Sequence, residues 1–381
     1  MNKIDKSTRV GIDLAPAGMR ARAPGTSVLV EAQARTLLEM DVPWTWVPVF
    51  SNTDNPLRDI AEPFRPLTGK HHKFSQYASF ELGKLWEQAG CDLGFATAYF
   101  VPFSGPPVVA NYFDANFFED VDAWHRYKQL HKHLWTRMLF SHSVKKSESL
   151  FILSDYGRDR MVQLFPKTKN KWVVTKCGFT PPGPAPEKTP AWALEMKRPF
   201  FLYVGSFSDN KNQRTLLKAW NHIQSKYEDA PELVILGPGP VPYIRDVITP
   251  LHQGLPRPHE VTLPGFTPDE EVAWAFRNAL GYLQPSIAEG FGMPVIEAMS
   301  CGLPVACSNT TSLPSTAGDA ALLFNPLNDA EIASCAEKIW KDKTARTTLI
   351  AAGSERVKLF SWENNAKQVA SAIHDVLTKK T

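Results

Sequence analysis

Long hydrophobic runs, clustered cysteines and an excess of charge of one sign are all missing from this sequence of 381 residues. No apolar run approaches the ~18 residues that a membrane-spanning helix needs. The five cysteines are odd in number and form no Cys-x-x-Cys, which argues against a disulfide framework and a zinc site. The N-terminus lacks a signal peptide's apolar core, and a net charge of +3 does not indicate nucleic-acid binding. We therefore expect a cytoplasmic protein with no nucleic-acid partner.

Proline, in contrast, is concentrated in one place. Residues 180–190 contain five prolines in eleven positions, which excludes a helix or a central strand there. The length of the chain favours two domains. We therefore predict an N-terminal domain at 1–180, a linker at 181–197 and a second domain at 198–360.

Both halves alternate apolar, strand-like runs with helix-like segments, a pattern typical of parallel sheets with right-handed crossovers. The predicted strands cover 9–14, 44–50, 108–112, 150–154, 198–207, 232–237, 261–266, 280–284 and 304–308. The predicted helices cover 26–40, 77–88, 124–146, 212–226, 243–253, 268–278 and 293–300. We predict an α/β protein with two Rossmann-like, doubly wound domains and a cleft between them, with ligands bound beyond the carboxyl ends of the strands.

The most informative segment reads EGFGMPVIE, from Glu289 to Glu297. It follows a predicted strand and enters a predicted helix, and Gly290 and Gly292 allow another molecule to approach the backbone closely. Free N–H groups at a helix start bind anions, so one carboxylate could grip a sugar and the other a ribose with a diphosphate between them. The alternative is that both glutamates only complement the helix dipole.

Several stretches together resemble the retaining glycosyltransferases of family 4, which have the GT-B fold. They read YVGSFSDNKN, LPGFTPDEEVAWAFRNALGYLQPS, EGFGMPVIEAMSCGLPVACSN and GDAALLFNP, and they span about Tyr203 to Pro326. The C-terminal FSWENNAKQVASAI resembles that family's last helices. The resemblance implies two Rossmann-like domains facing each other across a cleft, with 361–381 crossing back to the first. The first half matches only in outline.

The resemblance also implies roles for individual residues. Glu297 would bind the ribose hydroxyls and Glu289 those of the donor sugar. Lys211 would neutralise the diphosphate, as an ammonium in a strand-to-helix loop could do on physical grounds; it could also be a solvated surface lysine. The backbone around the glycines would meet the sugar and the phosphate, which involves Gly290, Phe291, Gly292 and Met293.

One departure from the family pattern concerns an arginine near Lys211. The two positions where the family places it are Ser206, directly after Gly205, and Asn210. Arg214, one helical turn further on, is a possible substitute. Helix N–H groups would otherwise take a larger share of diphosphate binding.

In the first domain, Asp114 falls where the family often reads His-Asp, and Phe113 replaces the histidine. Asp114 could contact the donor sugar or stabilise positive charge at the anomeric carbon, or it could cap a turn. Gly18, Gly25 and Thr26 follow the first predicted strand and precede a helix. They could face a phosphate or the acceptor, or form a plain N-cap.

The stretch 124–147 has six Lys/Arg, no Asp/Glu, and the aromatic residues Trp124, Tyr127, Trp135 and Phe140 between them. A basic helix with aromatics can rest on anionic lipid at the inner face of the cell membrane, although it could equally pack on its own domain. Histidines at 125, 131, 133 and 142 do not have metal-ligand spacing.

From these residues and the resemblance we expect a retaining, metal-independent hexosyltransferase without a cofactor. Its donor would be a nucleoside-diphosphate sugar, with GDP-mannose first and a UDP-sugar close behind. Its acceptor would be a hydroxyl of a glycan or lipid-linked glycan, in surface polysaccharide synthesis. The alternatives are a nucleotide-sugar epimerase or phosphorylase, and a non-catalytic subunit that binds sugar nucleotides.

Overall fold

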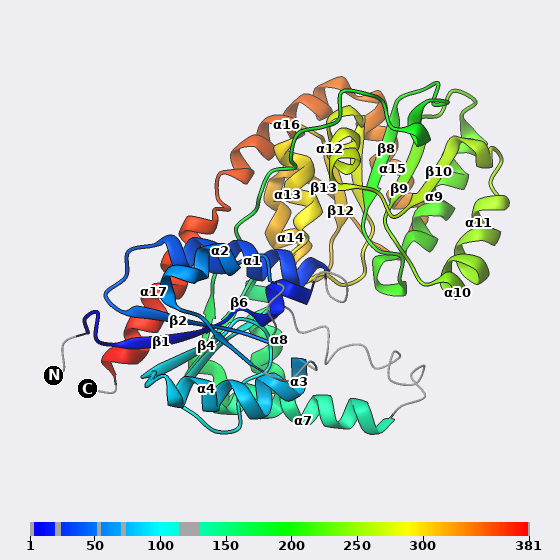
Figure 1. Ribbon diagram of the computed structural model, residues 1–381. Helices are drawn as coiled ribbons and strands as arrows, with labels where there is room; N and C mark the ends of the chain where they lie inside the picture. Colours follow the sequence, from blue (N-terminus) through cyan, green and yellow to red (C-terminus); the bar gives the residue numbers. More distant parts are fainter. Residues whose placement is uncertain (1–3, 20–23, 52–54, 70–73, 114–129, 380–381) are drawn as a thin grey trace. The chain divides into compact units, whose positions relative to one another are not determined.

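The computed structural model describes residues 4–19, 24–51, 55–69, 74–113 and 130–379 (Figure 1). The chain divides into two compact units. Unit 1 consists of Met1–Gly178 and Ser361–Thr381, and unit 2 is the continuous segment Phe179–Phe360. No helix in the described ranges is both long and apolar enough to cross a bilayer.

Unit 1 is built on a parallel sheet with the strand order β3-β2-β1-β4-β5-β6-β7. The strands are β1 (Arg9–Asp13), β2 (Thr45–Phe50), β3 (Leu67–Thr68), β4 (Leu93–Ala96), β5 (Val108–Tyr112), β6 (Ser149–Ile152) and β7 (Trp172–Val174). In β1, Val10 pairs with Trp46 on one side and with Leu93 on the other. The strand order reverses at β1 and β4, which is where sheets of this kind leave a crevice for ligands.

The helices of unit 1 cover both faces of this sheet, as a doubly wound fold requires. They are η1 (Ala15–Met19), α1 (Pro24–Glu39), α2 (Arg58–Ala61), η2 (Glu62–Phe64), α3 (Phe74–Gln76), η3 (Tyr77–Glu81), α4 (Leu82–Gln88), α7 (Leu130–Lys146), α8 (Asp155–Leu164), η4 (Pro166–Lys171) and α17 (Trp362–Thr378). Trp86 of α4 lies directly on the sheet, because Gly11 and Gly94 beneath it leave the space that a Cβ atom would fill.

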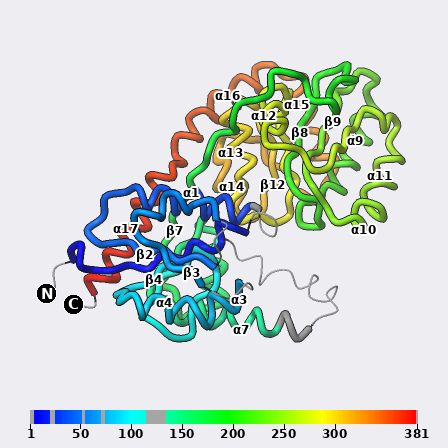
Figure 2. The backbone as a smooth tube through the Cα atoms, viewed as in Figure 1, coloured from blue at the N-terminus to red at the C-terminus, as the bar shows by residue number. Residues whose placement is uncertain are grey.

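Helix α17 follows unit 2 in the sequence but packs against α1 of unit 1, beside which it runs in Figures 1 and 2. A buried chain of amides fastens it. Asn111 of β5 donates to Gln33 of α1 at 2.6 Å, Gln33 donates to Asn365 of α17 at 2.7 Å, and Asn365 donates to the carbonyl of Lys176 at 3.0 Å. Because buried amides left unpaired cost free energy, this chain fixes where α17 docks.

Unit 2 is built on a second parallel sheet, with the order β10-β9-β8-β11-β12-β13. The strands are β8 (Phe200–Val204), β9 (Glu232–Leu236), β10 (Val261–Gly265), β11 (Gly281–Gln284), β12 (Val305–Ser308) and β13 (Ala321–Phe324). The order reverses at β8 and β11, where Gly281 pairs with Phe201. The carboxyl ends of these two strands are therefore the place to look for a site.

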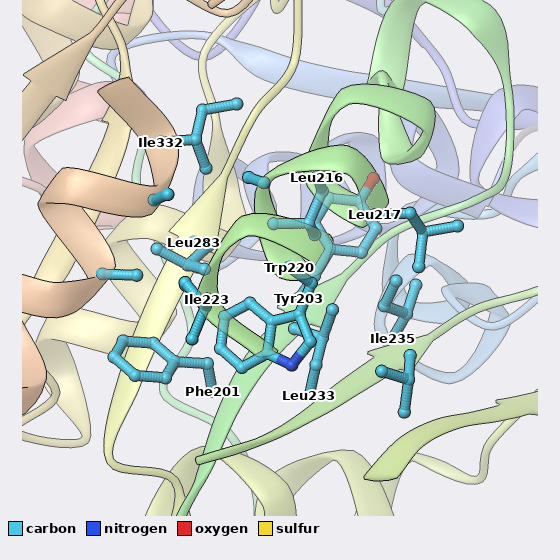
Figure 3. Packing of buried hydrophobic residues seen from close by; sticks show 14 of the residues in the cluster. Phe201, Tyr203, Leu216, Leu217, Trp220, Ile223, Leu233, Ile235, Leu283 and Ile332 are labelled. Carbon is cyan, nitrogen blue, oxygen red and sulfur yellow. The ribbon is translucent and has the colours of Figure 1, made fainter. Parts of the chain in front are cut away.

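The helices of unit 2 connect these strands. They are η5 (Ala191–Ala193), η6 (Asp209–Lys211), α9 (Gln213–Lys226), α10 (Val241–Tyr243), η7 (Ile244–Ile248), α11 (Thr249–Gln253), η8 (Pro258–Glu260), α12 (Asp269–Asn278), α13 (Met293–Ser300), α14 (Leu313–Ala317), η9 (Gly318–Ala320), α15 (Asp329–Lys341) and α16 (Lys343–Val357). Figure 3 shows the core between α9 and the sheet, where Trp220 packs among Phe201, Leu233 and Ile235.

The proline-rich segment with the rest of the predicted linker, residues 181–197, is part of unit 2. The indole of Trp192 donates to Glu271 at 2.8 Å and meets Trp274 edge to face at 5.6 Å. Arg277 donates to the carbonyl of Pro182 at 2.8 Å. The proline-rich segment is therefore held by side chains of α12.

Candidate active site

Two charged side chains meet at the carboxyl edge of the unit 2 sheet. Lys211 ends η6, which follows β8, and Glu289 lies in the loop that follows β11. The Lys211 Nζ atom is 2.6 Å from Glu289 Oε1, and the two side chains are 24% and 10% exposed. The reversal of strand order thus brings together two residues that are 78 positions apart in the sequence.

The Glu289 carboxylate is held from several directions. Its Oε1 atom accepts hydrogen bonds from Lys211, from Gln284 Nε2 at 2.9 Å and from Ser286 Oγ at 2.8 Å. Its backbone is also fixed, since its N–H donates to Thr311 at 3.0 Å and its carbonyl accepts from Ser312 at 2.8 Å. A carboxylate with this many partners is pre-organised before any ligand arrives.

Helix α13 begins immediately after this loop. Gly292 is its N-cap with φ +95°, a left-handed conformation that suits glycine, and Pro294 occupies the first turn. The Phe291 side chain points into the core, where its ring packs 5.3 Å from that of Phe360. Because the ring is buried, the groups that an anion can bind at the start of α13 are the backbone N–H groups.

Glu297 lies in the second turn of α13. Burial, with a smaller contribution from the charge of Asp269, raises the pKa of this carboxyl from 4.5 to about 7. Asp269 begins α12, just after β10 and the 79% exposed Phe266. Strongly perturbed acids are enriched in functional sites, and Glu297 lies on the helix that begins just after Glu289, so it is a candidate member of this site.

The predicted basic residues beyond Lys211 do not join this cluster. Arg214 is paired with Asp209 at 3.4 Å on the surface. The Asn210 carbonyl accepts a hydrogen bond from the Ile287 N–H at 2.8 Å, and the Ser206 carbonyl accepts one from Gln213 at 2.8 Å. The Asn210 backbone thus links the loop after β8 to the loop after β11, and the Ser206 backbone is held by the start of α9.

In unit 1, the structure places Gly25 and Thr26 differently from the prediction. Helix α1 begins at Pro24, so both residues lie inside its first turn and not before it, because proline is well suited to a first helical position. The Ser27 hydroxyl donates to the carbonyl of Pro16 at 2.9 Å. Gly18 is exposed at the end of η1.

Phe113, the residue at the position of the family's histidine, is buried against Tyr99, with ring centroids 5.4 Å apart. Its neighbour Asp114 lies outside the described residues, as do Trp124 and Tyr127. Phe140 also differs from the expectation, because it is buried in the core of unit 1 and cannot contribute to a surface.

Sequence reasoning missed three buried polar residues. Gln284 and Ser286 touch Glu289, and their position directly at the end of a strand was the available signal. Asp13 ends β1, is fully buried, and accepts from Ala15 N–H at 3.0 Å and Tyr77 OH at 3.1 Å through Oδ1 alone. Burial raises the pKa of Asp13 to about 7.

Within the described ranges, no group of three or more His, Cys, Asp or Glu side chains is arranged to hold a metal ion. An Asp-x-Asp sequence, Asp120-Val121-Asp122, lies outside those ranges. The site at the carboxyl edge of the unit 2 sheet is formed by carboxylates, a lysine, amides and a helix start.

Comparison with known proteins agrees with this picture. Residues 185–356 match the family described as glycosyl transferases group 1. The O-antigen chain mannosyltransferase B of Escherichia coli is 32% identical over 241 residues, which cover 60% of this chain and 61% of that protein. The serotype-specific mannosyltransferase WbdA of Escherichia coli is 29% identical over 168 residues, which cover 44% of this chain and 20% of that protein. The chain thus spans less than two thirds of the length of these relatives.

Solved structures resemble the whole chain. Sucrose-phosphate synthase from Thermosynechococcus elongatus has a TM-score of 0.70 at 19% identity, covering 98% of this chain and 100% of the other. WaaG, a glycosyltransferase involved in lipopolysaccharide biosynthesis, has a TM-score of 0.69 at 16% identity, covering 95% and 98%. At these identities the likeness concerns the fold. The chain therefore has the GT-B fold of two Rossmann-like units, and the match to the glycosyl transferases group 1 family falls in its second unit.

Proposed function

We propose that this protein is a retaining glycosyltransferase that moves a hexose, with mannose as the first choice, from a nucleoside-diphosphate sugar to a hydroxyl of a glycan acceptor. The observation that carries the proposal is the Lys211–Glu289 pair at the carboxyl edge of the sheet, beside the start of α13. The similarity to the O-antigen chain mannosyltransferase B supports mannose and a role in surface polysaccharide synthesis.

Each part of the donor has a suitable group in unit 2. The Glu289 carboxylate accepts hydrogen bonds from sugar hydroxyls, and Lys211 together with the N–H groups at the start of α13 takes the diphosphate charge. Glu297 binds the ribose hydroxyls from the second turn of α13. Phe266, exposed after β10, offers the base an apolar surface.

We propose front-face attack for the transfer step. The acceptor oxygen bonds to the anomeric carbon, the bond from that carbon to the diphosphate oxygen breaks, and the acceptor proton passes to the leaving diphosphate. The protein's own part is to hold the sugar through Glu289 and to stabilise the leaving charge through Lys211 and the start of α13. This scheme needs neither a protein nucleophile nor a cofactor, and it is metal-independent.

Nucleotide binding provides the first test. GDP or UDP, but not both equally, should raise the melting temperature, because a ligand that binds only the folded state stabilises it. Glu297→Ala should lose most of this shift, and Glu270→Ala, which removes an exposed carboxylate of the same unit, should keep it. If no nucleotide shifts the wild type, the donor-binding proposal is wrong and the function must be sought elsewhere.

The raised pKa of Glu297 adds a pH dependence to this test. The ionised carboxylate is the better acceptor for ribose hydroxyls, and with a pKa of about 7 its ionised fraction rises about tenfold between pH 6 and pH 8. Donor-sugar affinity, measured by calorimetry, should therefore strengthen by up to tenfold over this range. In Glu297→Ala the affinity should be weak and independent of pH, and a wild-type affinity that is equal at both pH values would contradict the ribose role.

We further propose that the acceptor is lipid-linked and that unit 1 meets an anionic membrane through the stretch 124–147. In α7, Leu134, Trp135 and Met138 are 59%, 44% and 47% exposed. Leu134 and Met138 lie one turn apart on the same face of α7, as do Trp135 and Met138, which are three residues apart. Residues 130–146 contain four Lys/Arg and no acid. Clustered exposed apolar side chains on a basic helix are what an anionic bilayer surface binds.

The apolar surface continues beyond α7. The rings of Phe80 and Phe103 lie 5.2 Å apart and are 48% and 37% exposed, and Phe103 also meets His142 of α7 at 4.6 Å. Gly83 makes this possible, since a side chain there would collide with the carbonyl of Ser104. The loop that carries Phe103 is thus held against α4 with its ring facing outward.

Vesicle flotation tests the membrane contact without any sugar transfer. The protein should float with phosphatidylglycerol-containing vesicles and much less with pure phosphatidylcholine, and added salt should weaken binding. A Trp135→Glu/Met138→Glu variant should lose most of the bound fraction. Leu327→Glu, at a 72% exposed leucine in unit 2, is the matched control. If both variants floated equally well, the α7 contact would be refuted. If the wild type self-associated and the α7 changes abolished this, the surface would instead bind a second copy of the chain.

A further inference from the structure

A chain of buried polar side chains leads along β11 to Glu289. Tyr282, Gln284 and Ser286 are spaced two residues apart and are all essentially unexposed. Side chains at this spacing share one face of a strand. The Tyr282 hydroxyl is hydrogen-bonded to Gln284 Oε1, and Gln284 Nε2 donates to Ser286 Oγ at 2.8 Å and to Glu289 Oε1 at 2.9 Å.

The direction of this chain is fixed by its chemistry. Burial raises the pKa of the Tyr282 phenol, so the hydroxyl keeps its proton and can donate it to Gln284 Oε1 or to the Val204 carbonyl at 3.3 Å. Its bond to Gln284 Oε1 leaves the other end of the amide, which can only donate, facing Glu289. A flipped amide would set two acceptor oxygens against each other. The Glu289 carboxylate, together with the Tyr282 contact, therefore favours the orientation in which Gln284 presents N–H groups to Glu289.

The side-chain donors to Glu289 all reach the same oxygen. Lys211, Gln284 and Ser286 bond to Oε1, and among the described residues none donates to Oε2. The carboxyl group is thereby held against rotation, with its second oxygen available to a ligand. A ligand hydroxyl must come to that oxygen, because the carboxylate cannot turn to meet it.

We propose that Gln284 is the positioning residue that aims Glu289 and so sets which donor sugar is accepted. This inference rests on the proposed function and deepens it. A fixed acceptor oxygen can bond only to a hydroxyl at one position of the sugar ring. An epimer without a hydroxyl in that orientation leaves the buried carboxylate oxygen unpaired. Discrimination between epimeric sugars then depends on Gln284, a residue that does not itself touch the sugar.

The sharpest variant is Gln284→Glu, which keeps the shape of the side chain. Two carboxylates at this distance cannot both ionise, so they share one proton over a range of pH. When the introduced acid is protonated, its O–H donates to Glu289 and its other oxygen accepts from Tyr282, which reproduces the native pattern. When the proton leaves, the two side chains repel each other.

The expected result is a ratio of variant to wild-type kcat/KM that depends on pH. Gln284→Glu should lose about 10²-fold at pH 8 and recover most of this at pH 6, because the protonated acid restores the donor. Taking the ratio cancels the titration of Glu297. Gln284→Ala should also reduce the preference for GDP-mannose over GDP-glucose by roughly tenfold.

Gln224→Glu is the matched control. Gln224 is 2% exposed, belongs to the same unit, and donates to Glu260 at 3.4 Å, so the change creates a similar acid pair away from the site. It should change stability with pH but leave the kcat/KM ratio flat. The positioning role is wrong if the kcat/KM ratio of Gln284→Glu to wild type does not change with pH. It is also wrong if Gln284→Ala keeps the wild-type preference for GDP-mannose over GDP-glucose.

Unfolding measurements separate this inference from the proposed function. Gln284→Glu should become less stable as the pH rises, and Gln284→Glu/Glu289→Gln, which exchanges amide and acid, should regain stability without regaining transfer. If the wild type shows no transfer from any nucleotide sugar, the proposed function fails and the specificity role fails with it. If the wild type is active but the double variant is no more stable than the single one, the contact itself is refuted while the function stands.

Discussion

Glu289→Gln should lower kcat/KM for sugar transfer by about 10²–10³-fold, the usual cost of removing one pre-organised electrostatic group from an active site. The amide oxygen can still accept from Lys211, Gln284 and Ser286, so the fold should survive. Two things change. Lys211 loses the charge that holds it at 2.6 Å, and an NH₂ group replaces the oxygen that accepts a sugar hydroxyl.

Steady-state transfer from a nucleotide sugar, with melting temperatures of both proteins, measures this effect. Glu270→Gln is the control, since it removes an exposed carboxylate from the same unit. If the kcat/KM of Glu289→Gln stayed within threefold of the wild-type value, Glu289 would not be part of the active site. A large loss of both stability and activity would instead show that the carboxylate's main task is to hold its own loop together.

Compared with its effect at pH 4, Asp13→Asn should favour the folded state at neutral and alkaline pH by up to roughly 4 kcal/mol more, because a shift of one pKa unit is worth about 1.4 kcal/mol. The folded state holds the proton of Asp13 up to about pH 7, whereas the unfolded chain releases it near 3.8. The free energy of unfolding therefore falls as the pH rises from about 4 to about 7. Above pH 7 the folded protein carries the full cost of a buried, ionised Asp13 carboxylate. The asparagine has no charge to bury, although its Nδ2 takes the place of Oδ2, which has no partner among the described residues, at a cost that does not change with pH.

Denaturant unfolding of both proteins between pH 4 and pH 8 tests this sign. The stability of the variant relative to the wild type should be lowest at pH 4 and rise until about pH 7. Asparagine can keep the bonds from Ala15 and Tyr77, since both reach the same oxygen, Oδ1. Asp41→Asn, at a side chain that is 98% exposed, controls for the change of charge. A difference that stays constant with pH would mean that the buried carboxyl does not titrate as described.

Much of the fold could be predicted because it depends on local patterns. The strand at 9–14 and the helix at 293–300 are found at Arg9–Asp13 and Met293–Ser300. The strand Leu93–Ala96 was missed, since a four-residue run with a central glycine gives little signal. That glycine is there to accommodate Trp86 of α4, a partner that a reading along the chain does not reveal.

For the site too, local sequence patterns could be predicted and contacts between distant residues could not. Glu289 and Glu297 could be selected because a strand, a glycine-rich turn and a helix surround them in the sequence, and Lys211 because the family resemblance points to it in a strand-to-helix loop. That Lys211 touches Glu289 could not be predicted, because the contact depends on β8 and β11 being neighbours in the sheet. Gln284 also escaped notice, because a single glutamine at a strand end has meaning only once its partners are known.

The buried amide chain has a consequence for how the protein is made. Its first members, Gln33 and Asn111, precede unit 2 in the sequence, and its last, Asn365, follows it. Every strand of unit 2 lies within Phe179–Phe360, so that unit has all its parts before α17 is synthesised. Domains generally fold as units during translation. Unit 1 is thus completed after unit 2, because α1 cannot pack against α17 until the ribosome has translated the whole of unit 2.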